Sequence, residues 1–191
     1  KVWGNLICFL VGLRMKVTFE APLDTKRNYV IVANHCSYLD IVSTSCGLPI
    51  YFNYMAKYEL SRIPLFGRFF KTLDIAVNRK NRKQAVESFH EADRRLKEGT
   101  SIFIFPEGGI TKGSPKLSRF KPGAFKLALQ NNIAILPITL LDNYKRLPDG
   151  NILGGSPGKM RMIVHRLIEV VNLKPEDEGE LKQKVYCIIE K

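Results

Sequence analysis

The chain has 191 residues, which is enough for one sizeable hydrophobic core, and this length favours a single domain. Its 30 basic residues exceed its 18 acidic residues, so the formal net charge is +12. Such an excess implies a negatively charged partner: nucleic acid, anionic lipid headgroups or a phosphorylated substrate.

The cysteines and histidines argue against a metal site. Only three histidines occur, and the four cysteines have neither a Cys-x-x-Cys pair nor the spacing of metal ligands: they are Cys8, Cys36, Cys46 and Cys187. We therefore expect no metal, and reduced thiols in a protein that faces the cytosol.

The first segment, residues 2–13, is almost wholly apolar. As a helix it would span ~18 Å, which is short of the about 30 Å of a hydrocarbon core. It suits an interfacial anchor or a plain core helix, and it lacks the small-residue cleavage site of a signal peptide. We favour the anchor: residues 1–14 as a membrane-associating segment at the cytoplasmic face, and residues 15–191 as one domain.

Strand-like and helix-like segments alternate along the rest of the chain. The patterns predict strands at 15–20, 29–33, 50–56, 73–78, 101–105, 133–140 and 160–171, and helices at 39–46, 64–72, 84–97, 120–131 and 176–190. This order predicts an α/β fold with a mostly parallel or mixed central sheet flanked by helices. In such sheets, ligands bind at the carboxyl ends of the strands. His35, Arg79 and Glu107 each follow a predicted strand, so we expect them at one rim.

His35 and Asp40 stand out at the first of these strand ends. A histidine at a strand-to-helix turn, with a carboxylate one helical turn later, suits a general base and its orienting partner. A structural histidine beside a Ser37-x-x-Asp40 capping box fits the same residues. One carboxylate can serve both purposes, because acids are also favoured at helix starts.

Basic residues follow the next two strands. Lys57 lies at a strand-to-helix turn, and Arg79 is placed to clamp a phosphate through its guanidinium. A solvated helix entrance is the alternative for the basic residues at 80–83.

The turn after the strand at 101–105 is the last candidate. Gly108 and Gly109 would let a ligand approach the main chain, and Glu107 is able to bind a hydroxyl group. An ordinary turn with a solvated acid has the same composition. The basic residues that follow suit an anionic membrane or a phosphorylated carrier: Lys112, Lys116, Arg119, Lys121 and Lys126.

These motifs occur in a specific order over roughly residues 15–140. They are Asn34-His35-x4-Asp40, Lys57-x-Glu59-Leu60, a strand that ends near Arg79, Phe105-Pro106-Glu107-Gly108, and Ile135-Leu136-Pro137-Ile138. This ordered set resembles the glycerolipid acyltransferase family, in particular the 1-acyl-glycerol-3-phosphate (lysophosphatidic acid) acyltransferases. The resemblance implies a glycerol-3-phosphate acyltransferase-like fold.

The resemblance also implies roles for the motif residues. His35 would be the general base and Asp40 would orient it. Lys57 and Arg79 would bind the phosphate of the acyl acceptor, and Glu107 would help to hold its glycerol part.

Gly108 would share the glycerol role of the turn, and Pro137 would lie near the acyl or acceptor pocket. One departure concerns the phosphate. The family commonly reads Glu-Gly-Thr-Arg, whereas Gly109-Ile110 follows Gly108 here, so the arginine is absent at Ile110. Lys112, two positions later, is a candidate to replace it.

The expected reaction is a direct acyl transfer without a cofactor. His35 would remove a proton from the free hydroxyl of 1-acyl-glycerol-3-phosphate, and the oxygen would attack the thioester of acyl-CoA or acyl-carrier protein to make phosphatidic acid. The expected partners are these lipid and thioester substrates, an anionic membrane surface and, as one donor, the carrier protein. Cys36 is a rival nucleophile, although neighbours in sequence rarely point the same way at a strand end.

Three alternatives to this reaction stay open. Another lysolipid could be the acceptor, or His35 and Asp40 could act on water as a hydrolase. The third alternative is a non-catalytic module that binds anionic surfaces or nucleic acid. We expect no nucleic-acid partner, because the aromatic residues are not interleaved with the basic runs.

Overall fold

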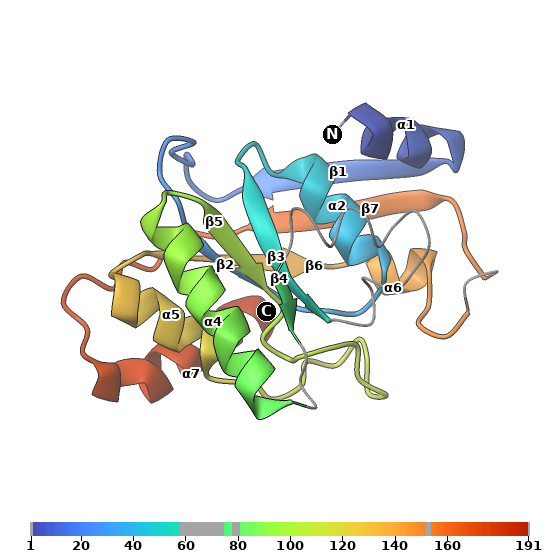
Figure 1. Ribbon diagram of the computed structural model, residues 1–191. Helices are drawn as coiled ribbons and strands as arrows, with labels where there is room; N and C mark the ends of the chain where they lie inside the picture. Colours follow the sequence, from blue (N-terminus) through green and yellow to red (C-terminus); the bar gives the residue numbers. More distant parts are fainter. Residues whose placement is uncertain (1, 58–74, 78–80, 152–153, 191) are drawn as a thin grey trace.

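The computed structural model of the chain describes residues 2–57, 75–77, 81–151 and 154–190. Within these ranges it contains a seven-stranded sheet. In spatial order the strands are β1 (Leu13–Phe19), β7 (Gly158–Val164), β6 (Ile135–Leu140), β2 (Val30–Ala33), β5 (Ser101–Ile104), β3 (Phe52–Lys57) and β4 (Ile75–Val77). The helices are α1 (Val2–Leu10), α2 (Leu39–Gly47), α4 (Arg82–Lys97), α5 (Gly123–Asn131), α6 (Asn143–Arg146) and α7 (Glu178–Glu190), which follows the 3₁₀ turn Pro175–Asp177 (Figure 1).

The sheet is mixed, as expected. The neighbours β6, β2, β5, β3 and β4 run parallel to one another. β7 pairs antiparallel with β6 and parallel with β1. The α/β fold with a mostly parallel or mixed sheet is therefore confirmed.

Helices cover both faces of the central strands. Val30 and Val32 of β2 face a core cluster that α4, α5 and α7 complete, and Ile31 and Ala33 face a second cluster beside α2. Figure 1 shows α4, α5 and α7 gathered on one side of the molecule, away from α2. Because both faces are covered, β2, β5 and β6 are buried at every position, which explains why these strands are near-continuous apolar runs in the sequence.

The connections from β2 and β5 diverge to opposite faces of the sheet. β2 leads into α2 on one face, whereas β5 leads towards α5 on the other. Neighbouring parallel strands whose connections diverge leave a crevice at their carboxyl ends, where α/β folds bind ligands. The loops that carry His35 and Glu107 begin at this crevice.

Several element boundaries differ from those that the sequence predicts. α4 begins at Arg82 rather than Gln84, because the Asn81 side chain caps the helix by accepting hydrogen bonds from two backbone N–H groups. α5 begins only at Gly123, after Pro122. β7 ends at Val164, and an isolated bridge at Ile168 is all that continues the predicted strand.

The predicted helix at 64–72, the short helix α6 and the N-terminal segment remain to be compared with the sequence. The predicted helix at 64–72 lies outside the described residues, and α6 was not predicted. The apolar N-terminal segment forms α1 over Val2–Leu10, and β1 follows from Leu13. In the part of the chain that the structure describes, no helix is both long and apolar enough to cross a membrane.

Candidate active site

His35 and Asp40 form a close pair at the end of β2. The His35 Nδ1 atom lies 2.8 Å from the Asp40 Oδ2 atom. The Asp40 side chain is fully buried, whereas the His35 side chain keeps 13% of its surface exposed. Because Nδ1 faces a carboxylate, a neutral imidazole carries its proton on Nδ1 and leaves a lone pair on Nε2. The pair therefore has the geometry of a general base and its orienting acid.

Asp40 also closes the turn at the start of α2. Its Oδ2 atom accepts the backbone N–H groups of Cys36 at 2.7 Å and Ser37 at 2.9 Å. The Ser37 hydroxyl accepts from the backbone N–H of Leu39 rather than from that of Asp40, so the predicted capping box is made in one direction only. One carboxylate therefore both pairs with His35 and makes half of the capping box, and the catalytic role of the pair stays a prediction.

Asn143 is a contact of Asp40 that sequence reasoning missed. It is the first residue of α6, shortly after β6, and is fully buried. Its Nδ2 atom donates to the Asp40 Oδ1 atom at 2.7 Å and to the Ser43 hydroxyl at 2.8 Å. A neutral donor satisfies the buried carboxylate without cancelling its charge. The only signal in the sequence was a polar residue close to the end of a buried strand.

Phe105 holds the other side of the histidine. The rings of His35 and Phe105 are stacked, with centroids 4.0 Å apart and an angle of 14° between their planes. The stacked phenyl ring limits the orientations open to the imidazole. The sequence contains Phe105 in a motif, but its contact with His35 depends on the pairing of β2 with β5.

Glu107 links the two loops at the crevice. Its Oε1 atom accepts the backbone N–H of His35 at 2.8 Å. Its Oε2 atom accepts both the backbone N–H and the hydroxyl of Ser118, at 2.9 Å and 2.8 Å. Since protein donors engage both oxygens of this buried carboxylate, Glu107 fixes the loop of His35. The predicted contact of Glu107 with the glycerol part of a substrate stays a prediction.

The glycines after Glu107 take conformations that side chains disfavour. Gly108 has φ of 85° and Gly109 has φ of 147°. A Cβ atom on Gly108 would lie 2.5 Å from the Nζ atom of Lys121, so the approaching group that the structure shows is the lysine. Lys112 is exposed in the loop that follows.

The two predicted phosphate-binding residues, Lys57 and Arg79, differ in what the structure describes. Lys57 is the last residue of β3 and pairs with Val77, the last residue of β4, although its side chain is not among those described. Arg79 lies outside the described residues. β3 and β4 thus end side by side, and the roles of Lys57 and Arg79 stay predictions.

Cys36 is unsuited to act as the nucleophile. It is 2% exposed. Burial, together with the negative charge of Asp40, raises the pKa of its thiol far above the ordinary value. The thiolate is the nucleophilic form of cysteine, so Cys36 stays an unreactive thiol at neutral pH. Among the described residues, no group of three or more potential ligands is placed to hold a metal ion.

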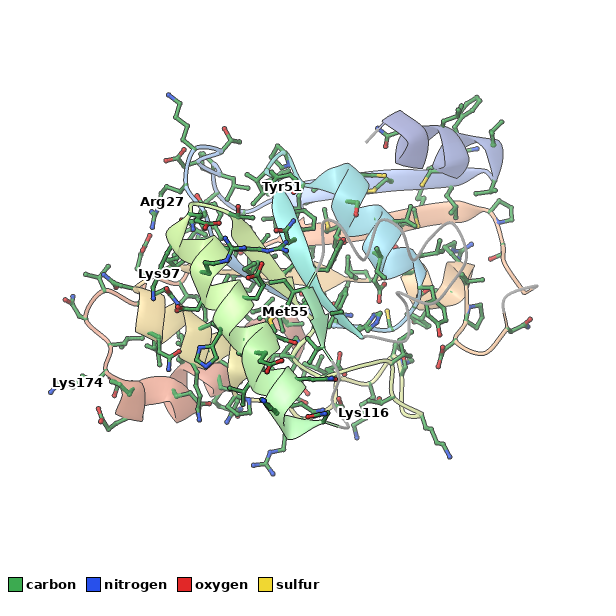
Figure 2. The ribbon with its side chains drawn as sticks, viewed as in Figure 1. Arg27, Tyr51, Met55, Lys97, Lys116 and Lys174 are labelled. Atoms are coloured by element: carbon green, nitrogen blue, oxygen red, sulfur yellow. The ribbon has the colours of Figure 1, made fainter. Side chains whose placement is uncertain are left out.

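One hollow lies beside the Glu107 loop, and a second lies between α4 and α5. An apolar cavity of about 230 Å³ lies between the sheet edge, α4 and α5, and its lining includes Met55 (labelled in Figure 2), Phe89, Ile104 and Gly108. A groove of about 710 Å³ runs between α4 and α5 on the outside. Lys121 lines both of them.

Comparison with known proteins identifies the family to which this chain belongs. The acyltransferase family model matches residues 14–141, about two thirds of the chain. The crystal structure of the 1-acyl-sn-glycerophosphate (LPA) acyltransferase PlsC from Thermotoga maritima superposes with a TM-score of 0.84 at 25% identity, over 99% of this chain and 74% of that one. The chain therefore belongs to the acyltransferase family, and its fold is that of the PlsC acyltransferase.

Two curated relatives are similar over most of the chain. The chloroplastic 1-acyl-sn-glycerol-3-phosphate acyltransferase of Arabidopsis thaliana is 34% identical over 175 residues, which is 88% of this chain and 47% of the relative. The 1-acyl-sn-glycerol-3-phosphate acyltransferase of Borreliella burgdorferi is 32% identical over 178 residues, which is 91% of this chain and 69% of the relative. The chain thus spans between about half and two thirds of the length of these two proteins.

Proposed function

We propose that the protein transfers a fatty acyl group from an acyl thioester to the free hydroxyl of 1-acyl-sn-glycerol-3-phosphate, which makes phosphatidic acid. The observation that carries this proposal is the 2.8 Å contact between His35 and Asp40, because it leaves Nε2 of His35 as a base at the crevice. The names of the relatives support the choice of acceptor.

The mechanism follows from the groups around His35. Nε2 takes the proton of the acceptor hydroxyl as its oxygen attacks the thioester carbonyl. The tetrahedral intermediate then expels the thiolate, which takes the proton back from the imidazolium. Asp40 stabilises the imidazolium in between, and Phe105 stacks on its ring. No acyl-enzyme forms, and the reaction requires no cofactor. The thioester is acyl-CoA or acyl-carrier protein.

A membrane surface is the proposed setting of the reaction. Both lipids reside there, and α1 with the turn that follows it presents exposed apolar side chains: Leu6, Phe9, Leu10 and Val11. The net charge of +12 would attract anionic headgroups of a cytoplasmic leaflet. The apolar cavity beside the Glu107 loop suits a hydrocarbon chain.

Thiol release from acyl-CoA, with and without lysophosphatidic acid, tests this function. We expect release that depends on the acceptor. His35→Ala should reduce the rate roughly 100-fold or more because the base is lost, while circular dichroism shows that the fold is retained. Cys36→Ala is the matched control beside it and should stay active.

The same assay identifies the alternatives. Release without an acceptor would make the protein a hydrolase, and no release at all would leave a binding function. Full activity of His35→Ala would end the proposed mechanism.

A further inference from the structure

Lys121 lies against the Glu107 loop, which fixes the backbone of His35. In the sequence it follows Glu107 by more than ten residues. Its backbone N–H donates to the carbonyl oxygen of Pro106 at 2.9 Å. Its ammonium group folds back over Gly108, where a Cβ atom would lie 2.5 Å from Nζ and 2.9 Å from Cε. Both ends of Lys121 are thus held beside the turn at Glu107.

The charge of Lys121 is available to a ligand. Glu107 is the nearest carboxylate in the sequence of this loop, and its oxygens already accept hydrogen bonds from His35 and Ser118. The residue is exposed, and none of the salt bridges among the described residues includes it. In the groove that it lines, Lys97 is instead neutralised by Asp93 at 2.7 Å.

A cation is needed close to His35 if the proposed function holds. In 1-acyl-glycerol-3-phosphate, the free hydroxyl and the phosphate ester are on adjacent carbon atoms. When the hydroxyl lies at Nε2 of His35, the phosphate must therefore lie close to the same loop. The resemblance leaves this place without an arginine, because position 110 is isoleucine.

We propose that Lys121 binds the phosphate of the lysolipid acceptor and thereby selects a phosphorylated acceptor. This inference rests on the proposed function. Gly108 contributes to this site, because a side chain at this position would displace the ammonium group from its place over the turn. Lysine suits this task, since its ammonium binds phosphate as a point charge with three donors.

Equilibrium binding of two matched ligands tests the inference without the need for catalysis. A short-chain 1-acyl-glycerol-3-phosphate and the corresponding 1-acyl-glycerol differ only in the phosphate. We expect Lys121→Met to weaken binding of the first roughly ten- to hundredfold and to leave binding of the second unchanged. Lys121→Arg should retain most of the affinity. Lys126→Met is the matched control, because Lys126 lines the outer groove but not the inner cavity.

Kinetics then distinguish the acceptor phosphate from the phosphates of coenzyme A. In Lys121→Met the KM for the acceptor should rise, with kcat changed less. This should hold both for acyl-CoA and for a phosphate-free acyl N-acetylcysteamine thioester. A KM increase for acyl-CoA alone would assign Lys121 to the donor and overturn the inference.

Failure of this inference differs from failure of the proposed function. Unchanged binding of the phosphorylated ligand in Lys121→Met, or an equal loss in Lys126→Met, overturns the role of Lys121 even if the wild type transfers acyl groups. If the wild type transfers no acyl group but Lys121→Met selectively loses binding of the phosphorylated ligand, the phosphate site is supported and the proposed reaction is overturned. A wild type that does not bind the phosphorylated ligand overturns both.

Discussion

His35 is held by Asp40 of α2 and by two residues of the loop after β5, Phe105 and Glu107. Asp40 orients Nδ1, Phe105 stacks on the ring, and Glu107 accepts the backbone N–H of the same residue. A base on a loop would otherwise lose catalytic efficiency through disorder, because misplacement of about 1 Å is costly. Asn143 acts on the ring indirectly, because it donates a hydrogen bond to the Asp40 carboxylate that orients the ring.

Asn143→Leu tests this positioning role. Leucine cannot donate to Asp40, so we expect kcat to fall about tenfold, from the loss of one charge-assisted hydrogen bond, while the KM for the acceptor stays the same. Asn131→Leu is the control: its Nδ2 atom also donates to an aspartate, Asp93, but at the end of α5 away from the crevice. Equal loss of kcat in both variants would reduce Asn143 to a structural residue.

The element that presents Asn143 is small and depends on its neighbours. α6 has only four residues, too few to be stable alone. Asp142, directly before it, is held to β7 by two hydrogen bonds from the Arg161 guanidinium, at 2.6 Å and 2.8 Å. These hydrogen bonds and the charge of Arg161 lower the pKa of Asp142 below its ordinary value.

Arg161→Met should lower the urea midpoint at neutral pH and loosen α6. The lowered pKa of Asp142 determines how this stabilisation changes with pH. Its stabilising effect is complete above the ordinary aspartate pKa of 3.8 and is lost as the pH falls below it. The difference in urea midpoint between wild type and Arg161→Met should therefore shrink between pH 7 and pH 3. A constant difference would show that the ion pair is not its cause.

At the scale of the whole molecule, charge and apolar surface favour the same partner. The chain carries a net charge of +12, and Phe9 and Leu10 on α1 are 79% and 72% exposed. Basic charge draws a protein to an anionic surface, and exposed apolar side chains then enter the interface. We propose that α1 contacts the membrane in this way.

Co-sedimentation with vesicles of anionic phospholipid checks this proposal. The double variant Phe9→Ser with Leu10→Ser should bind roughly a hundredfold more weakly or worse, since two apolar side chains worth about 1.5–3 kcal/mol each when buried are lost. Val171→Ser is the control, because Val171 is 64% exposed elsewhere on the surface. If both variants lose the same affinity, α1 has no special part in binding.

Local patterns in the sequence predicted most of the helices and strands and, within the site, the contact of His35 with Asp40. Strands that are buried on both faces are mostly apolar, so β2, β5 and β6 are visible as near-continuous apolar runs, with Ser101 and Thr139 as the polar exceptions. The alternation of strands with helices was enough to predict the mixed α/β sheet and the rim that carries His35 and Glu107. The spacing of His35 and Asp40 predicted their contact, because residues this close in sequence meet within one turn of chain.

The tertiary structure decided which distant side chains complete the crevice. Asn143 reaches Asp40 across 103 residues, and Glu107 reaches the backbone of His35 across 72. Lys121 folds over Gly108 only because the segment before α5 returns to the loop after β5. Periodicity and spacing report on neighbours within an element, whereas these contacts arise from how β2, β5 and β6 lie side by side in the sheet.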